Sequence, residues 1–226
     1  MTSPDRRTRR QQRTWRRQAT RYDEQIGRAE SGVIGTARRW IGERASGRTL
    51  EVAVGSGRSI PFYRDDVQLT GIDLSPEMLA IADTRVAGRA HPVDLMIGDA
   101  EALPFDDAEF DTVVCALALC SIPRPALAIA EMKRVLRPGG TLLLADHVRS
   151  TWPPVTAVLW IAELFTVPVQ GEHLTRRHLA TVRSAGLTVV EHERRSFGMV
   201  ETIRALNTPS PPDAGPGATV ERGPTR

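Results

Sequence analysis

The sequence predicts an α/β protein with a seven-stranded, mostly parallel sheet and helices on both faces. Short apolar runs alternate with longer segments of helical spacing, which is typical of a parallel sheet covered by helices. Two further runs, 188–195 and 199–206, flank Ser196, Phe197 and Gly198 and predict a C-terminal antiparallel hairpin that closes one sheet edge. The five preceding runs cover residues 49–54, 68–73, 93–97, 110–117 and 141–146.

Helical spacing predicts helices at 76–87, 125–137, 155–165 and 175–185. The first of them begins where Ser75 precedes Pro76, because proline is favoured at the first helical position. The second ends at Pro138-Gly139-Gly140, which turns the chain into the next strand.

Length and composition restrict the classes of protein to which this chain can belong. The chain has 226 residues, 41% of them hydrophobic, which suits one domain with a sizeable core. It shows no apolar run of the roughly 20 residues that span a bilayer, and no secretory signal. Cys115 and Cys120 are too few for a disulfide framework or a four-ligand zinc site, so we expect packed thiols, no metal and a reduced, cytoplasmic protein.

The net charge of +3 is unevenly distributed. Residues 1–21 carry eight arginines against Asp5, a net charge of +7, which leaves 22 basic and 26 acidic residues and a net charge of −4 for the remainder. Between Arg6 and Arg21 the apolar residues are Trp15 and Ala19, so we interpret residues 1–21 as a disordered arginine-rich arm. Such an arm is compatible with weak peripheral contact with an anionic membrane, whereas specific nucleic-acid binding is not expected.

The other end of the chain, residues 208–226, is rich in proline and glycine and is predicted to be disordered. The folded domain is therefore expected at 22–207.

A glycine pair follows the first predicted strand, in the segment Leu50-Glu51-Val52-Ala53-Val54-Gly55-Ser56-Gly57. Glycines between a strand and a helix let a ligand approach backbone N–H groups at the helix N-terminus. The pair alone is a weak signal, and Ile60 stands where a dinucleotide-binding loop has its third glycine.

Two carboxylates strengthen the signal of this loop. Asp73 ends the second predicted strand, where it could accept hydrogen bonds from a ribose, and Asp99 ends the third, where it could accept one from an adenine amine. Either residue could instead cap a helix. The glycine loop and the two acids follow three consecutive strands, at the edge where open α/β sheets bind ligands, and this favours a nucleoside site.

The ordered motifs LEVAVGSG, TGIDLSPEML, GDAEALPF, FDTVVCALALCSI and EMKRVLRPGG resemble those of class I S-adenosylmethionine-dependent methyltransferases over about residues 20–206. The resemblance implies a Rossmann-like fold and S-adenosyl-L-methionine as the cofactor. Ala53 departs from the pattern, because many members carry a glycine there. Within this class the chain is most similar to methyltransferase-like thiol methyltransferases, and also to bacterial phospholipid and quinone methyltransferases.

The resemblance also assigns roles to individual residues. Asp73 would hold the ribose hydroxyls, Asp99 with the Ala100 backbone would recognise the adenine, and Tyr22 would lie on a helix that covers the cofactor. The implied cofactor-binding residues are Tyr22, Glu51, Ala53, Gly55, Gly57, Asp73, Leu74, Asp99, Ala100, Ala116 and Leu117.

The expected reaction is methyl transfer to a small, lipophilic acceptor, with a thiol or an amine favoured. The apolar segment 152–169, with Trp160, Ile161, Leu164 and Phe165 at helical spacing, is predicted to cover the acceptor. The candidate general bases are His147 and His173, because the pKa of histidine lies nearest neutrality, although either could make only a structural hydrogen bond.

Three alternatives remain open. The acceptor could be a quinone or a phospholipid. A nicotinamide-dependent oxidoreductase is disfavoured by the missing third glycine. The arginine-rich arm raises a third alternative, a non-catalytic module that binds a cofactor or nucleic acid. The sequence predicts no particular oligomeric state.

Overall fold

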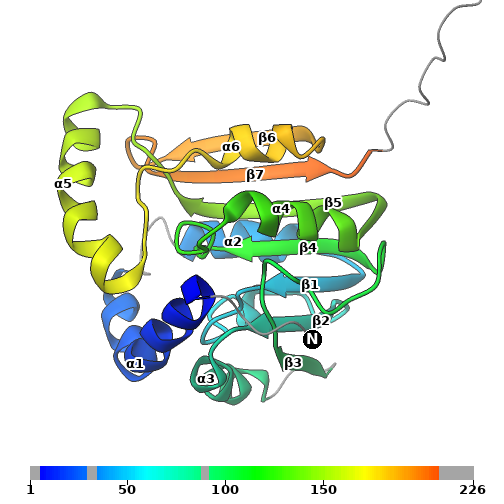
Figure 1. The fold of residues 1–226 in the computed structure, drawn as a ribbon. Helices are drawn as coiled ribbons and strands as arrows, with labels where there is room; N and C mark the ends of the chain where they lie inside the picture. Colours follow the sequence, from blue (N-terminus) through cyan, green and yellow to red (C-terminus); the bar gives the residue numbers. More distant parts are fainter. Residues whose placement is uncertain (1–5, 30–34, 88–91, 209–226) are drawn as a thin grey trace, which may run out of the picture.

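A single seven-stranded sheet organises the protein, with strand order β3-β2-β1-β4-β5-β7-β6 (Figure 1). The structure is a computed structural model, which describes residues 6–29, 35–87 and 92–208. The first five strands are parallel, and β7 lies antiparallel between β5 and β6. The predicted fold class is therefore confirmed, including the C-terminal hairpin.

All seven predicted runs form strands. Most boundaries agree within two residues; the largest difference is that the strand predicted from residue 141 already begins at Leu136, which pairs with Phe110. Gly139 has a φ of +77° within this strand, and its N–H donates to the Asn207 carbonyl at 2.7 Å. The strands are β1 (Arg48–Val52), β2 (Gln68–Asp73), β3 (Val93–Ile97), β4 (Phe110–Ala116), β5 (Leu136–His147), β6 (Thr188–Arg195) and β7 (Val200–Leu206).

The four predicted helices are present as α3 (Pro76–Val86), α4 (Pro125–Val135), α5 (Pro153–Gln170) and α6 (His178–Ser184). The start of α3 is as predicted, because the Ser75 hydroxyl caps it by accepting the Met78 N–H at 3.3 Å. The helix expected after the glycine pair is only a 3₁₀ turn, η2 (Ile60–Phe62). In the described part of the chain, no helix has both the length and the hydropathy needed to cross a membrane.

A further helix, α2 (Gly35–Arg44), was not predicted. It packs closely on η2, because a Cβ at Gly42 would lie 2.2 Å from the Phe62 carbonyl oxygen. Arginines interrupt its apolar pattern, although Trp40 and Ile41 are buried.

The central strands β1, β2, β4 and β5 are buried on both faces, which explains their apolar runs, whereas the edge strands β3 and β6 are partly exposed. Successive residues of β4 belong to different hydrophobic clusters, with Val113 in one and Val114 in the other. The Val113 cluster includes Ile129 and Met132 of α4, and the Val114 cluster includes Ile41 of α2.

The prediction of a disordered arm at 1–21 is wrong for residues 6–21, because α1 runs from Arg6 to Ala29. Thr8, Gln11 and Ala19 are buried, and a spacing of three or four residues places them on one helix face with Gln12 and Trp15. The helix is amphipathic, because arginines occupy its opposite face, and a count of apolar residues alone, Trp15 and Ala19, missed this periodicity. The predicted C-terminal tail lies outside the described residues from 209 onward.

Polar contacts attach α1 to two other helices. Gln12 Nε2 donates to the Leu74 carbonyl at 3.0 Å, just before α3, and Arg16 pairs with Glu77 of α3 at 3.0 Å. Toward α5, Arg10 donates to the Pro168 carbonyl at 3.3 Å. These contacts hold α1 beside the carboxyl ends of the parallel strands (Figure 1).

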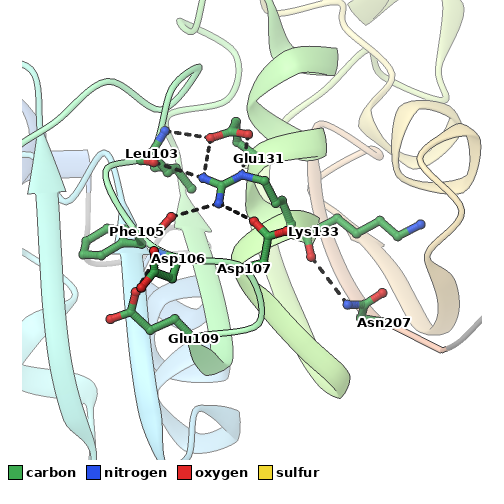
Figure 2. A network of polar contacts seen from close by, with 9 residues as sticks. Leu103, Phe105, Asp106, Asp107, Glu109, Glu131, Lys133 and Asn207 are labelled. Carbon is green, nitrogen blue, oxygen red and sulfur yellow. Dashed lines mark hydrogen bonds and ion pairs between the residues drawn. The ribbon is translucent and has the colours of Figure 1, made fainter. Parts of the chain in front are cut away.

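A polar network fixes the segment between β3 and β4. The guanidinium of Arg134, on α4, donates to the carbonyls of Leu103 and Phe105 and to the carboxylates of Asp107 and Glu131. Glu131 in turn accepts the Leu103 N–H at 2.8 Å, and Figure 2 shows these groups converging. The network anchors to α4 the segment that begins with Asp99 and Ala100.

We predict that Arg134→Ala lowers the free energy of unfolding by about 1–3 kcal/mol, because two carbonyls and two carboxylates lose a charged donor. Arg134→Lys should recover little of this, since an ammonium cannot reproduce the planar fork of donors. The control is Arg137→Ala, which removes an exposed ion pair with Asp111 and should cost less than about 0.5 kcal/mol. Urea denaturation measures all three variants, and equal losses for Arg134→Ala and Arg137→Ala would contradict the prediction.

Candidate active site

A pocket that is open to solvent lies at the carboxyl ends of β1, β2 and β4. The sheet order reverses between β1 and β4, and open α/β sheets bind ligands at such a switch point. The pocket brings together most of the predicted cofactor-binding residues: Ala53, Gly55, Asp73, Leu74, Asp99, Ala100, Ala116 and Leu117.

The two glycines of the loop have different roles. A Cβ at Gly55 would meet no heavy atom within 4 Å, so the backbone faces open space in the pocket. A Cβ at Gly57 would lie 2.7 Å from Ile60 Cδ1 and 2.9 Å from Ala82 Cβ. Gly57 therefore allows close packing against α3, whereas Gly55 is where a ligand could approach bare backbone.

Two residues other than glycine adopt left-handed backbone conformations on the pocket wall. Ala53 follows β1 with a φ of +56°, and Leu117 follows β4 with the same φ. Such a conformation costs about 1–3 kcal/mol for a residue with a Cβ. Many class I methyltransferases have glycine at the position of Ala53. Alanine keeps the same loop conformation here, at the cost of some backbone strain.

Asp73 connects the glycine loop to the start of α3. Its Oδ2 accepts the Gly55 N–H at 2.9 Å, and its Oδ1 accepts the Ser75 N–H at 2.9 Å. Burial raises the pKa of Asp73 to about 6, although hydrogen bonds from Ser75, Gly55 and Leu74 act in the opposite direction. The carboxylate therefore has a structural role, and its two oxygens keep lone pairs for a ligand in the pocket that it lines.

Glu51 lies in a buried polar cluster of β1 and does not line the pocket. It is 1% exposed, and its Oε2 accepts the Tyr63 hydroxyl at 3.0 Å. Burial raises the pKa of Glu51 to about 7, against the lowering effects of Ser59, Arg38 and Tyr63. Glu51 can therefore act on a ligand only through neighbouring groups, such as Arg38, which does line the pocket.

The structure adds pocket residues that were not predicted. Arg38 of α2 donates to Ser59 Oγ at 2.9 Å, and Thr8, Gln11 and Trp15 contribute from α1. Gln11 is 9% exposed, and its buried Nε2 has no hydrogen-bond partner within the described ranges. Tyr22 also belongs to α1, but its side chain is outside the described part of the structure.

Neither predicted base lines the pocket. His147 has its Nδ1 4.0 Å from Asp146 Oδ1, and the His173 N–H donates to the Cys120 carbonyl at 3.0 Å. Possible metal-ligating atoms of Cys120, Asp146 and His147 lie within 4.8 Å of one another. However, the two oxygens of Asp146 already accept the N–H groups of His147 and Cys120, at 2.6 Å and 2.7 Å.

The prediction that segment 152–169 covers the acceptor is not supported by the pocket geometry. Among the described residues, those that line the pocket include none from α5. Trp160, Ile161, Leu164 and Phe165 are instead exposed to solvent.

We predict that Glu51→Gln reduces the loss of stability at rising pH. The pKa of Glu51 is about 7 in the folded protein against 4.5 as the ordinary value, so the folded state binds the proton more tightly. Glu51 should therefore lower the free energy of unfolding by up to about 3 kcal/mol as the pH rises through this range, and Glu51→Gln should remove this part, while the part contributed by Asp73 remains. Denaturation between pH 5 and pH 8 measures how the free energy of unfolding depends on pH. The control is Asp94→Asn, at an exposed position of β3. The same pH dependence in Glu51→Gln as in the unmodified chain would contradict the prediction.

Comparison with known proteins adds independent information. Residues 50–144 match the family model described as a methyltransferase domain. A phosphatidylethanolamine N-methyltransferase of Cereibacter sphaeroides is 43% identical over 114 residues, which are 50% of this chain and 56% of that protein. A demethylmenaquinone methyltransferase of Renibacterium salmoninarum is 35% identical over 133 residues, 55% of this chain and 54% of that protein. The chain thus spans about half the length of these relatives.

Solved structures show the same fold. An S-adenosylmethionine-dependent methyltransferase of Thermotoga maritima aligns with a TM-score of 0.70 and 21% identity, covering 87% of this chain and 99% of that one. The cyclase SpnF aligns with a TM-score of 0.63 and 23% identity, covering 76% and 80%. Residues 50–144 thus match a methyltransferase domain, and the chain shares the fold of these solved structures, with its pocket at the switch point of the sheet.

Proposed function

We propose that this protein transfers the methyl group of S-adenosylmethionine to a small or membrane-held lipophilic acceptor, with an amine or a thiol as the methylated group. The observation that carries the proposal is the pocket at the β1–β4 switch point, which contains the buried Asp73 carboxylate, the open backbone at Gly55 and the unpartnered Gln11 amide.

The residues present suit the cofactor. The carboxylate of Asp73 would accept from the ribose hydroxyls, and Leu74 would lie against the adenine. Asp99 and the backbone of Ala100 would recognise the adenine edge, and the open backbone at Gly55 would accommodate the methionine moiety. S-adenosylmethionine, when bound, supplies a methyl group on a positively charged sulfur.

The protein has little covalent chemistry to perform in such a reaction. Its contribution is to hold the acceptor in line with the methyl group, and positioning of this kind lowers a barrier by up to about 7–11 kcal/mol. Ala118, Ser121 and Ile122 form the pocket wall after β4, where the acceptor would lie. Because neither His147 nor His173 lines this wall, the proposal assigns them no proton transfer.

The acceptor class rests on two observations. The pocket wall after β4 is largely apolar, and the relatives named above act, by their names, on an aminophospholipid and on a quinone. The aminophospholipid of the first relative supports an amine as the methylated group. Both relatives support a lipophilic acceptor. Methylation of a quinone is the second candidate.

We predict that Asp73→Asn weakens S-adenosylmethionine binding by about 1–3 kcal/mol, because the ribose hydroxyls lose a charged acceptor. Asparagine retains one acceptor oxygen for the loop, so the variant should fold, whereas Asp73→Ala should also loosen the Gly55 and Ser75 contacts. Calorimetric titration measures the affinity, and exposed Asp83→Asn on α3 is the control. Unchanged affinity in Asp73→Asn would leave the carboxylate with a structural role only.

We also predict that turnover rises with acceptor chain length. In matched series of alkylamines and alkylthiols below their micelle concentrations, two additional methylenes should raise kcat/KM by up to about tenfold. Ile122→Ala should flatten this slope because Ile122 lines the pocket, whereas Phe165→Ala should leave it unchanged. Release of S-adenosylhomocysteine measures turnover, with phosphatidylethanolamine and a demethylated naphthoquinol as further acceptors. A flat series, or turnover only on nucleic acid or protein, would overturn the acceptor class.

A further inference from the structure

Helix α5 presents a broad apolar face to solvent. Its side chains at 158, 161 and 165, and at 160 and 164, recur at helical spacing, so they share one side of the helix. The exposed large apolar residues of α5 are Val158 (64%), Trp160 (55%), Ile161 (60%), Leu164 (71%), Phe165 (70%) and Val169 (62%). An apolar face of this size that is exposed to solvent indicates an interaction site.

This apolar face carries no charge and continues beyond the helix. Glu163, the one charged residue in α5, accepts the N–H and the hydroxyl of Thr175 at 2.8 Å and 2.9 Å, which turns it away from the exposed face. Before the helix, Trp152 stacks on Phe197 with ring centroids 5.6 Å apart, and both rings are more than half exposed.

Arginines lie near both ends of α5. At its C-terminal end, α1 is attached through the carbonyls of Pro168 and Val169, which accept from Arg10 and Gln18. The remaining exposed α1 arginines are Arg6, Arg9, Arg13, Arg16 and Arg17.

At the N-terminal end, Thr151 lines a second pocket together with four arginines, Arg149, Arg177, Arg183 and Arg194. Arg194 pairs with Glu201. A long apolar face with cationic groups at both ends suits a surface that is both apolar and negatively charged.

We propose that α5 is a peripheral docking surface for an anionic lipid bilayer, with its apolar face at the acyl–headgroup boundary and the arginines on the lipid phosphates. A second copy of the chain fits less well, because a two-fold contact through α5 would bring the flanking arginines of both copies together. Residues 209–226 offer Val220 as their one large aliphatic side chain, too little to cover the face. The inference concerns where the chain binds and does not depend on methyl transfer.

The test is co-sedimentation of the full chain with vesicles, without cofactor or acceptor. We expect binding to vesicles containing roughly 30% phosphatidylglycerol, weak or no binding to pure phosphatidylcholine, and loss of binding at high salt. The double variant Leu164→Ser/Phe165→Ser should weaken binding at least about tenfold, since serine removes most of the apolar contact. The matched control Leu127→Ser/Val190→Ser changes apolar side chains that are 45% and 49% exposed on α4 and β6, and should bind as the unmodified chain does.

Charge is tested separately. Arg6→Gln/Arg13→Gln on α1 should weaken binding to the anionic vesicles, whereas Arg64→Gln/Arg137→Gln, with the same change in net charge, should not. Equal binding to neutral and anionic vesicles, no binding to either, or equal effects of a variant pair and its control would overturn the proposal.

A dimer in light scattering that Leu164→Ser/Phe165→Ser dissociates would overturn the proposal in favour of a second copy. Turnover on soluble acceptors is read independently, so failure here is distinct from failure of the proposed function.

Discussion

The geometry of the pocket depends on the carboxylate of Asp73. Its two oxygens accept backbone N–H groups from opposite sides, Gly55 in the loop after β1 and Ser75 at the start of α3. This arrangement holds the loop open at Gly55 and fixes the beginning of α3 at the same time. Burial raises the pKa of Asp73, because the charged carboxylate loses its hydration. A ligand whose hydroxyl groups donate hydrogen bonds to this carboxylate would stabilise its charged form.

The strands and the strand-end residues could be predicted from the sequence because they follow local rules. Buried parallel strands are continuous apolar runs, and the acids that end them meet at one sheet edge whatever the loop details. α1 was missed because the expectation of a disordered arm counted only its apolar residues. Its inward face of Thr8, Gln11 and Gln12 is polar and differs from the outer face by the absence of arginine. The distance of His147 and His173 from the pocket is a tertiary property that no local pattern carries.

The two faces of α1 connect the pocket with the outer surface. Thr8, Gln11 and Trp15 line the pocket, while Arg13 and Arg17 of the same helix are exposed. The arginine-rich segment is therefore part of the pocket wall as well as of the outer surface, and a substitution on either face of α1 should be checked for its effect on the other.

The fold itself does not determine the reaction, since a cyclase and a methyltransferase share it with similar TM-scores. In this chain the segments that complete the pocket beyond the strand ends include α1 and residues 118–123. The apolar residues of α5 contribute nothing to the pocket wall and are too exposed to stabilise the core, so neither packing nor cofactor binding accounts for them. The proposed contact with an anionic bilayer would give a physical reason for an uncharged face of this size beside two groups of arginines.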